Sequence, residues 1–207
     1  LKGNPVAIQI PIGSQSDFTG AIDLITRQAY RFVPDAPMPE EMDIPEGMAD
    51  EVEAHRAAMI EKVAEADDDL MMKYLVDEEI TEEELIEGLR NGTIAGKIQP
   101  TLCGSALRRM GVAPILDAIV NYLPSPMDVP AAEGIDPKTD ETLTRPPSLD
   151  EPAAAIVFKV VADQHVGRLV YLRVYSGKLV SGENVFNPGR RQRERLGRLM
   201  RIHAESR

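Results

Sequence analysis

Apolar residues in the first part of the chain form short runs that predict strands. Residues 6–12 (VAIQIPI) are almost continuously apolar, which predicts a buried strand. Residues 21–33 (AIDLITRQAYRFV) predict a second strand or two short ones. Four prolines among acidic residues indicate a loop at 34–45.

The spacing of apolar residues then changes to that of helices. Between residues 46 and 90, apolar positions recur at helical spacing and the remaining positions are mostly Glu or Asp, which predicts three helices. Pro45 favours the start of the first helix, and the Asp67–Asp69 run separates it from a short second one. Thr81-Glu82-Glu83-Glu84 has the form of a capping box that opens the third helix, and Asn91-Gly92 is predicted as its C-terminal cap.

One more strand and one more helix precede a proline-rich segment. IQPTLC at 98–103 predicts a short strand, and the apolar segment between Pro114 and Pro124 predicts a helix. Residues 124–152 hold seven of the sixteen prolines, so we interpret them as an extended linker that contains a domain boundary.

Beyond residue 151 the pattern has a period of two, which is typical of strands. Strands are predicted at 153–162, 167–175, 179–187 and 191–203. This spacing predicts a small β-barrel, of which four strands would form only a part. The fold class predicted for the chain is therefore α+β: a mixed N-terminal region, a linker, and part of a barrel.

Charge is distributed unevenly along the chain. The net charge is −11 overall. Residues 40–90 hold 19 acidic and 4 basic side chains, whereas residues 151–207 hold 5 acidic and 11 basic ones. The acidic total therefore hides a basic C-terminal region, and it does not exclude a nucleic-acid partner. No apolar run approaches the length of a membrane helix. Cys103 is the single cysteine, which excludes an internal disulfide and favours a cytoplasmic location.

Several short motifs fail when their full pattern is examined. Gly96-Lys97 lacks both the first glycine and the final Ser or Thr of a phosphate-binding loop. Asp17-Phe18-Thr19-Gly20 fits the D-x-x-G pattern of GTPase switches, but a turn between strands explains it more simply. The histidines and Cys103 do not have zinc-ligand spacing, so we expect no metal site and no catalytic residue.

Two charged regions each allow two interpretations. Six arginines fall within twelve positions, Arg190, Arg191, Arg193, Arg195, Arg198 and Arg201. Such a cluster suits contact with a nucleic-acid backbone, and it equally suits a barrel edge that is protected by charge. The acidic helices at 46–90 form either a solvated face or a docking surface for a basic partner.

Two longer stretches carry a family resemblance: CGSALRRMGVAPILDAIVNYLPSPMDVP at 103–130 and VGRLVYLRVYSGKLVSGENVFNPGRRQRERLGRLMRIHA at 166–204. Both resemble bacterial elongation factor G, a translational GTPase. NPVAIQIPIG, DFTGAIDL and the helical stretch 46–90 resemble the inserted subdomain of that factor. The resemblance covers essentially the whole chain and implies that it is an internal fragment of such a protein.

The resemblance implies four regions, in chain order. These are an inserted subdomain of the GTPase domain at 1–97, the end of the GTPase core at 98–123, a linker at 124–152, and the first part of the second-domain β-barrel at 153–207. Within the core end, Gly104-Ser105-Ala106-Leu107 corresponds to the fifth motif of the family, which contacts the guanine base. Ser105, Ala106 and Leu107 are therefore the expected guanine-binding residues, and no other nucleotide motif is present.

The resemblance also implies partners and a function. The intact protein is expected to bind GTP with Mg²⁺ and to promote translocation of tRNA and mRNA on the ribosome, whereas this chain alone is expected to bind no cofactor and to be inactive. Small-subunit rRNA is the expected partner of the barrel, through Arg190, Arg191, Arg193, Arg195 and Arg198, and the large-subunit stalk protein that of the acidic insert. The alternatives are a related ribosome-protection or rescue GTPase, or a ribosome-binding module that is not an enzyme.

Overall fold

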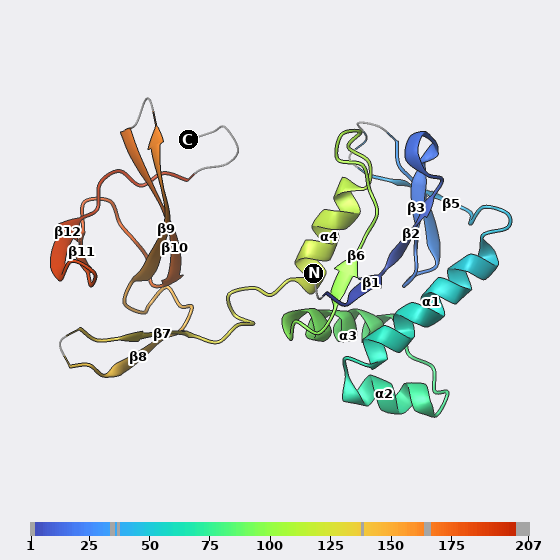
Figure 1. The fold of residues 1–207 in the computed structure, drawn as a ribbon, viewed down its shortest axis with the longest axis horizontal. Helices are drawn as coiled ribbons and strands as arrows, with labels where there is room; N and C mark the ends of the chain where they lie inside the picture. The colour runs from blue at the N-terminus through green and yellow to red at the C-terminus, as the bar shows by residue number, and fades with distance from the viewer. Residues whose placement is uncertain (1–2, 34–35, 37, 138, 164–166, 202–207) are drawn as a thin grey trace. The chain divides into compact units, whose positions relative to one another are not determined.

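The chain has an α+β fold that divides into two compact units, Leu1–Pro124 and Ser125–Arg207 (Figure 1). A computed structural model describes residues 3–33, 36, 38–137, 139–163 and 167–201. All helices of at least one α-helical turn among these residues lie in the N-terminal unit, and the C-terminal unit is built from strands.

Two sheets form the strand framework of the N-terminal unit. Its strands are β1 (Pro5–Ala7), β2 (Gln9–Ile12), β3 (Gly20–Asp23), β4 (Gln28–Arg31), β5 (Glu40–Met42) and β6 (Gln99–Thr101). Strands β2–β3–β4–β5 form an antiparallel sheet, and β1 pairs in parallel with β6. The apolar run at 6–12 is thus two strands. The chain passes from one sheet to the other at Ile8, whose N–H donates to the Thr101 carbonyl (3.0 Å) and whose carbonyl accepts from Leu24 N–H (3.0 Å).

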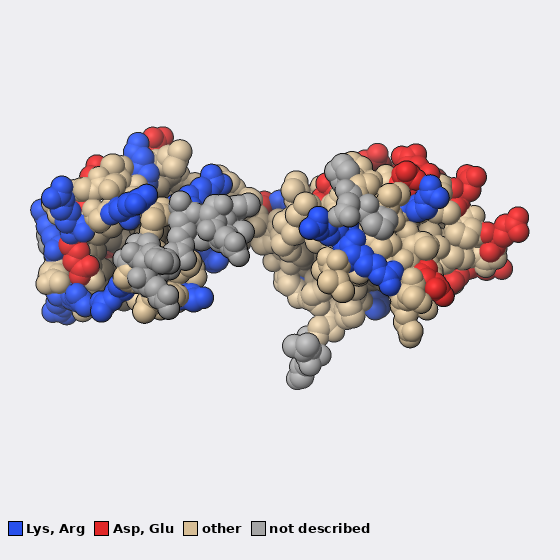
Figure 2. Space-filling view, turned by 90° about the horizontal axis from the view of Figure 1, so that it is seen from above, with Lys and Arg blue, Asp and Glu red and all other residues tan. Residues whose placement is uncertain are grey.

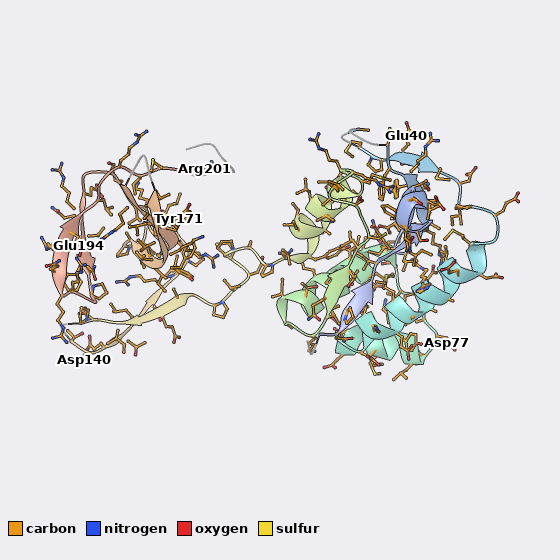
Figure 3. All side chains as sticks on the ribbon, turned by 45° about the horizontal axis from the view of Figure 1, so that its top comes forward. Glu40, Asp77, Asp140, Tyr171, Glu194 and Arg201 are labelled. Carbon is orange, nitrogen blue, oxygen red and sulfur yellow. The ribbon has the colours of Figure 1, made fainter. Side chains whose placement is uncertain are left out.

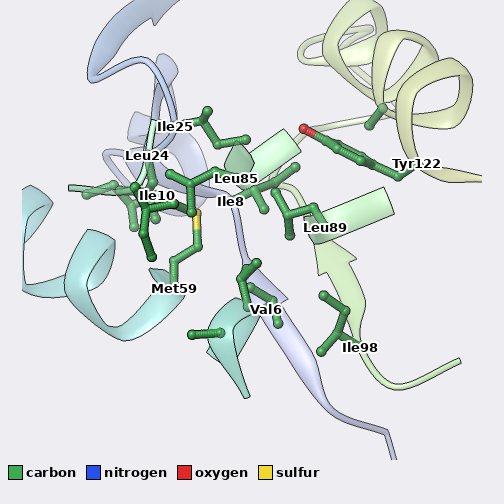
Figure 4. Close-up of a cluster of buried hydrophobic side chains, with 14 of the residues drawn as sticks. Val6, Ile8, Ile10, Leu24, Ile25, Met59, Leu85, Leu89, Ile98 and Tyr122 are labelled. Atoms are coloured by element: carbon green, nitrogen blue, oxygen red, sulfur yellow. The ribbon is translucent and has the colours of Figure 1, made fainter. Parts of the chain in front are cut away.

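Helices surround these strands and close the main core. They are α1 (Ala49–Ala64), α2 (Asp68–Leu75), α3 (Glu82–Ile94) and α4 (Val112–Tyr122), with a short 3-10 helix η1 (Gln15–Asp17) between β2 and β3. Helix α3 packs against α1, α4 and β6. Figure 4 shows the aliphatic core between them, to which α4 contributes the ring of Tyr122. Aliphatic side chains dominate this core because the chain has no Trp and few other aromatic residues.

The start of α3 confirms the predicted capping box, whereas its predicted end is wrong. The Thr81 hydroxyl accepts from Glu84 N–H (3.2 Å), and the Glu84 carboxylate accepts from Thr81 N–H (3.0 Å). The helix continues past Asn91-Gly92 to Ile94. A Cβ at Gly92 would lie 2.8 Å from the Ile98 side chain. Gly92 therefore serves close packing rather than helix termination, and Gly96 takes the left-handed conformation after the helix instead.

Replacing Thr81 by alanine is expected to destabilise the N-terminal unit by about 1 kcal/mol, because it leaves the Glu84 amide at the helix start without its side-chain acceptor. Urea unfolding followed by circular dichroism at 222 nm measures this loss, since the helical signal comes from this unit. Thr81→Ser keeps the hydroxyl and is expected to retain stability. Equal losses in the two variants would show that the hydroxyl does not act as a cap.

The C-terminal unit consists of three antiparallel hairpins. Their strands are β7 (Ala132–Ile135), β8 (Thr142–Arg145), β9 (Ala154–Asp163), β10 (Gly167–Ser176), β11 (Asn184–Asn187) and β12 (Gln192–Arg195). Strands β9 and β10 fall where the sequence predicts them, whereas β11 and β12 are shorter than predicted. Residues 202 and 203 of the last predicted strand lie outside the described residues. The described part of this unit forms no closed barrel.

The segment 124–152 differs from the extended linker that the prolines predict. It contains the β7–β8 hairpin, and its end is tied to β10 by two hydrogen bonds. The Ser176 hydroxyl donates to the Pro146 carbonyl (2.7 Å), and Gly177 N–H donates to the Ser148 carbonyl (2.8 Å). The prolines of this segment stand outside the paired positions of the hairpin, so they leave its backbone hydrogen bonds intact.

Candidate functional site

The segment that the resemblance assigns to guanine binding is a tight loop between β6 and α4. Ser105 N–H donates to the Met110 carbonyl (2.9 Å), and Met110 N–H donates back to the Ser105 carbonyl (3.0 Å). Inside this bridge, Arg109 N–H donates to the Ala106 carbonyl (3.2 Å). The residues at the tip are exposed, and Leu107 is 97% exposed. Residues 106–108 are therefore accessible to solvent.

The three expected guanine-binding residues differ in what their amides can do. The Ser105 amide is used by Met110, so it is not free to donate to a ligand in this conformation. Among the hydrogen bonds of the described residues, none uses the N–H of Ala106 or Leu107. Two adjacent N–H groups without an acceptor, on exposed residues, suit a carbonyl oxygen. The geometry thus suits Ala106 and Leu107 as donors and gives Ser105 the role of closing the loop.

Glycines at both ends of the loop allow its backbone to come close to itself. A Cβ at Gly104 would lie 2.9 Å from the Met110 carbonyl oxygen. Gly111 has φ +76, and a Cβ there would lie 2.9 Å from the Cys103 carbonyl oxygen. The Cys103 side chain is half-buried beneath the loop, and burial raises the pKa of its thiol. Cys103 is therefore a packing residue rather than an activated nucleophile.

Helix α4 leads away from the loop with one side in the core and the other side uncovered. Ala118 and Tyr122 are buried, and burial, with a smaller effect of the Asp23 carboxylate, raises the pKa of Tyr122 to about 12. The apolar residues that are at least 40% exposed on this helix and directly after it are Val112, Ile115, Leu116, Ile119, Val120 and Leu123. Exposed apolar surface of this extent is typical of a face that contacts more protein.

The predicted arginine cluster occupies the β11–β12 hairpin and the segment after it. The structure places Arg193 opposite Phe186 and Arg195 opposite Asn184, so both arginines share one face of the hairpin. All the cluster's arginines, Arg190, Arg191, Arg193, Arg195, Arg198 and Arg201, are exposed. The pairing of β11 with β12 therefore places two of the six arginines on the same face of the hairpin.

An acidic residue that carried no signal in the sequence divides this cluster. Glu194, labelled in Figure 3, lies on the opposite strand face, where its carboxylate is 3.6 Å from the Arg190 guanidinium and accepts from Asn187 (2.9 Å). Arg195 donates through Nε to the Gly182 carbonyl (3.1 Å), which fixes the stem of its side chain. The six arginines therefore do not form one continuous stripe, and the basic face that the strand pairing defines is that of Arg193 and Arg195.

Acidic and basic side chains gather on different units. Figure 2 shows acidic residues gathered at one end of the N-terminal unit, beside a smaller group of basic residues, and mainly basic residues among the charged ones of the C-terminal unit. Some of the acidic side chains are already paired within the unit. Lys73 lies 2.5 Å from Glu84 and 3.5 Å from Glu78, and the hydrogen bond from Lys73 lowers the pKa of Glu84. Most of the others on these helices are exposed and leave a negative surface.

Comparisons with known proteins bear on both units. Residues 152–207 match the family model described as elongation factor G domain 2. The structure is also similar to a crystal structure of a protein from Thermus thermophilus, with a TM-score of 0.69 and 27% sequence identity. The similarity covers 93% of this chain and 26% of the other, so the chain spans about a quarter of that protein's length.

These matches agree with the resemblance read from the sequence. One covers the second unit, and the other extends over nearly the whole chain, including the unit that carries the loop at 104–111. In the part of the chain that the structure describes, no helix has the length and apolar character needed to cross a membrane. Residues 152–207 are thus similar to the second domain of elongation factor G, and the chain as a whole is similar in fold to a segment of the Thermus thermophilus protein.

Proposed function

We propose that this chain is part of a cytoplasmic, ribosome-dependent GTPase that promotes the movement of tRNA and mRNA during protein synthesis. The observation that carries the proposal is the match of residues 152–207 to the second domain of elongation factor G. The loop that carries Ala106 and Leu107 leads into a helix, and the N–H groups of these two residues have no acceptor among the described residues, which also fits this proposal.

Ala106 and Leu107 would contact the guanine base of GTP. Both residues are exposed, and their N–H groups have no acceptor among the described residues, so these groups would donate to the carbonyl oxygen that guanine carries and adenine lacks. Such donors select the base and contribute only part of the binding free energy. No residue of this chain is assigned to the phosphates or to magnesium, because the pattern of a phosphate-binding loop does not occur in the sequence. Hydrolysis of GTP therefore belongs to the complete protein.

The uncovered face of α4 supports the placement of residues 98–123 at the end of a GTPase core. An amphipathic helix that exposes several aliphatic side chains normally packs against further protein. The short parallel pair β1–β6 has the strand direction of an α/β core, whereas the other described strand pairs are antiparallel. Both features fit a segment that completes a larger α/β domain.

Charge favours two ribosomal partners. The exposed arginines of the β11–β12 hairpin suit the backbone of small-subunit rRNA, since arginine donates to phosphate in a planar geometry. The acidic surface of α1 to α3 suits a basic surface of the large-subunit stalk. The sites are separate, so each interaction can be tested by itself.

The test uses the complete protein that contains this segment, purified and mixed with ribosomes, tRNA and mRNA. We expect GTP hydrolysis that ribosomes stimulate strongly, together with movement of the mRNA by one codon. If ribosomes stimulate GTP hydrolysis but the mRNA does not move, the assigned function would change from translocation to ribosome protection or rescue. Absence of any ribosome-stimulated hydrolysis would refute the GTPase assignment.

A further inference from the structure

The loop at 104–111 is held by residues far away in the sequence. The Arg108 guanidinium donates through one Nη atom to the Ser16 carbonyl (3.1 Å) and through the other to the Gln15 carbonyl (3.3 Å). These partners precede Arg108 by 92 and 93 positions. A planar guanidinium that donates twice fixes both the distance and the angle between the two segments.

A small apolar cluster provides a second attachment between the same segments. Met110, at the base of the loop, is 5% exposed and packs with Phe18, Ala21 and Phe32 of the antiparallel sheet region. The rings of Phe18 and Phe32 are 5.8 Å apart at their centroids and tilted by 56°, which is a favourable aromatic arrangement. Cys103, on the other side of the loop, packs against this cluster. The loop is therefore fixed at its base by packing and near its tip by Arg108.

The segment that accepts these contacts is a turn closed by its own hydrogen bonds. Asp17 N–H donates to the Ser14 carbonyl (2.9 Å), and Thr19 N–H donates to the Ile12 carbonyl (2.9 Å), which closes η1 against the sheet. Gly13 has φ +78, and a Cβ there would collide with the Asp17 carbonyl. These contacts within the turn fix the backbone that presents the Gln15 and Ser16 carbonyl groups to Arg108. Asp17-Phe18-Thr19-Gly20 spans the end of this turn and the first residue of β3, so this stretch has a structural explanation that does not involve phosphate.

We propose that the turn at 13–19 and Arg108 position the guanine-binding loop, so that the insert of the GTPase domain sets the affinity for guanine nucleotides. The proposal rests on the assignment of Ala106 and Leu107 to the guanine base. Arg108 lies directly after these residues, and its two hydrogen bonds restrain the backbone that presents their amides. Arg108 acts as a positioning residue and does not itself touch the nucleotide.

The first test measures the loop in this chain without any nucleotide. Amide hydrogen exchange by NMR is compared between the parent chain and Arg108→Ala, at the Ser105 and Met110 amides that form the bridge. Loss of two charge-assisted hydrogen bonds at an exposed site is expected to raise their exchange rates about threefold to tenfold. Arg108→Lys, which reaches one carbonyl at a time, is expected to restore part of the protection. Arg27→Ala removes an exposed arginine elsewhere in the unit and is expected to leave these amides unchanged.

The second test measures nucleotide use in the complete protein. Arg108→Ala is expected to raise the KM for GTP severalfold and to leave kcat unchanged, because the groups that act on the phosphates are not disturbed. Unchanged exchange at Ser105 and Met110 would overturn the positioning role while leaving the guanine assignment intact. Faster exchange with an unchanged KM would overturn the guanine assignment itself, and the proposal with it.

Discussion

Replacing Arg193 and Arg195 together by glutamine is expected to weaken binding of the chain to ribosomal RNA by about tenfold to a hundredfold at low salt. These two side chains share one face of the β11–β12 hairpin and are exposed. Removing one partner of a hydrogen bond between charged groups lowers the affinity roughly tenfold. Because each arginine displaces counterions from the RNA, the slope of log K against log salt concentration is expected to fall by about two.

The measurement is a binding titration by fluorescence anisotropy with labelled ribosomal RNA at several salt concentrations. Arg27→Gln with Arg31→Gln is the matched control: it removes the same charge from exposed arginines of the N-terminal unit, which are paired with Glu53 and Glu40. The control pair is expected to bind as the parent chain does. If both double variants weaken binding equally, net charge alone drives binding. If the affinity of the parent chain does not depend on salt concentration, the proposed contact with the RNA backbone is excluded.

A third variant uses the division that Glu194 introduces into the cluster. Arg190→Gln is expected to have a smaller effect than Arg193→Gln, since the Arg190 guanidinium already lies 3.6 Å from the Glu194 carboxylate. Glu194→Gln releases Arg190 and is expected to strengthen RNA binding. A reversed order of the two arginine variants would place the RNA on the opposite face of the hairpin.

The helices were well predicted from the sequence because their signals are local. The capping box at Thr81 and the N-cap Asp67 of α2 make hydrogen bonds within a few residues of themselves, and such bonds form wherever the helix lies. The end of α3 was missed for the opposite reason. Gly92 looks like a helix terminator in the sequence, but its role depends on Ile98 from another element. Tertiary packing decided that boundary.

Strand partners depend on contacts that no local pattern specifies. The break at Ile8 arises because β1 pairs with β6, more than ninety residues away, and an unbroken apolar run gives no sign of it. The hairpin at β7–β8 was hidden by the prolines around it. Their number suggested an extended segment, although none of them stands in a paired position.

The guanine-binding role of residues 104–107 stays a prediction, because it rests on their resemblance to a family motif. The structure adds that no hydrogen bond of the described residues uses the N–H of Ala106 or Leu107. The contacts that support this loop could not be predicted from the sequence. Arg108 carried no signal in the sequence, because its partners are backbone carbonyls, which any residue supplies. The same applies to Glu194, whose effect on the arginine cluster follows from the strand register.

Replacing Leu89 by alanine is expected to destabilise the N-terminal unit by about 2–5 kcal/mol. Leu89 is fully buried on α3 and lies in the core with Val6 and Ile98 (Figure 4), so truncation removes apolar contacts and leaves a cavity. A domain of this size is typically stable by about 5–15 kcal/mol, so the loss is a large fraction of the total.

Urea unfolding followed by circular dichroism at 222 nm measures this loss of stability for the N-terminal unit, because α1 to α4 all lie within it. Ile86→Ala is the matched control, since Ile86 lies on the same helix and is 37% exposed, and it is expected to cost much less. If the two variants lose equal stability, α3 does not pack with Leu89 inward. A correctly packed α3 connects the acidic surface to α4 and so to the loop at 104–111, because it contacts both α1 and α4. The Leu89 variant should therefore also increase hydrogen exchange at Ser105 and Met110, whereas Ile86→Ala should leave the loop protected.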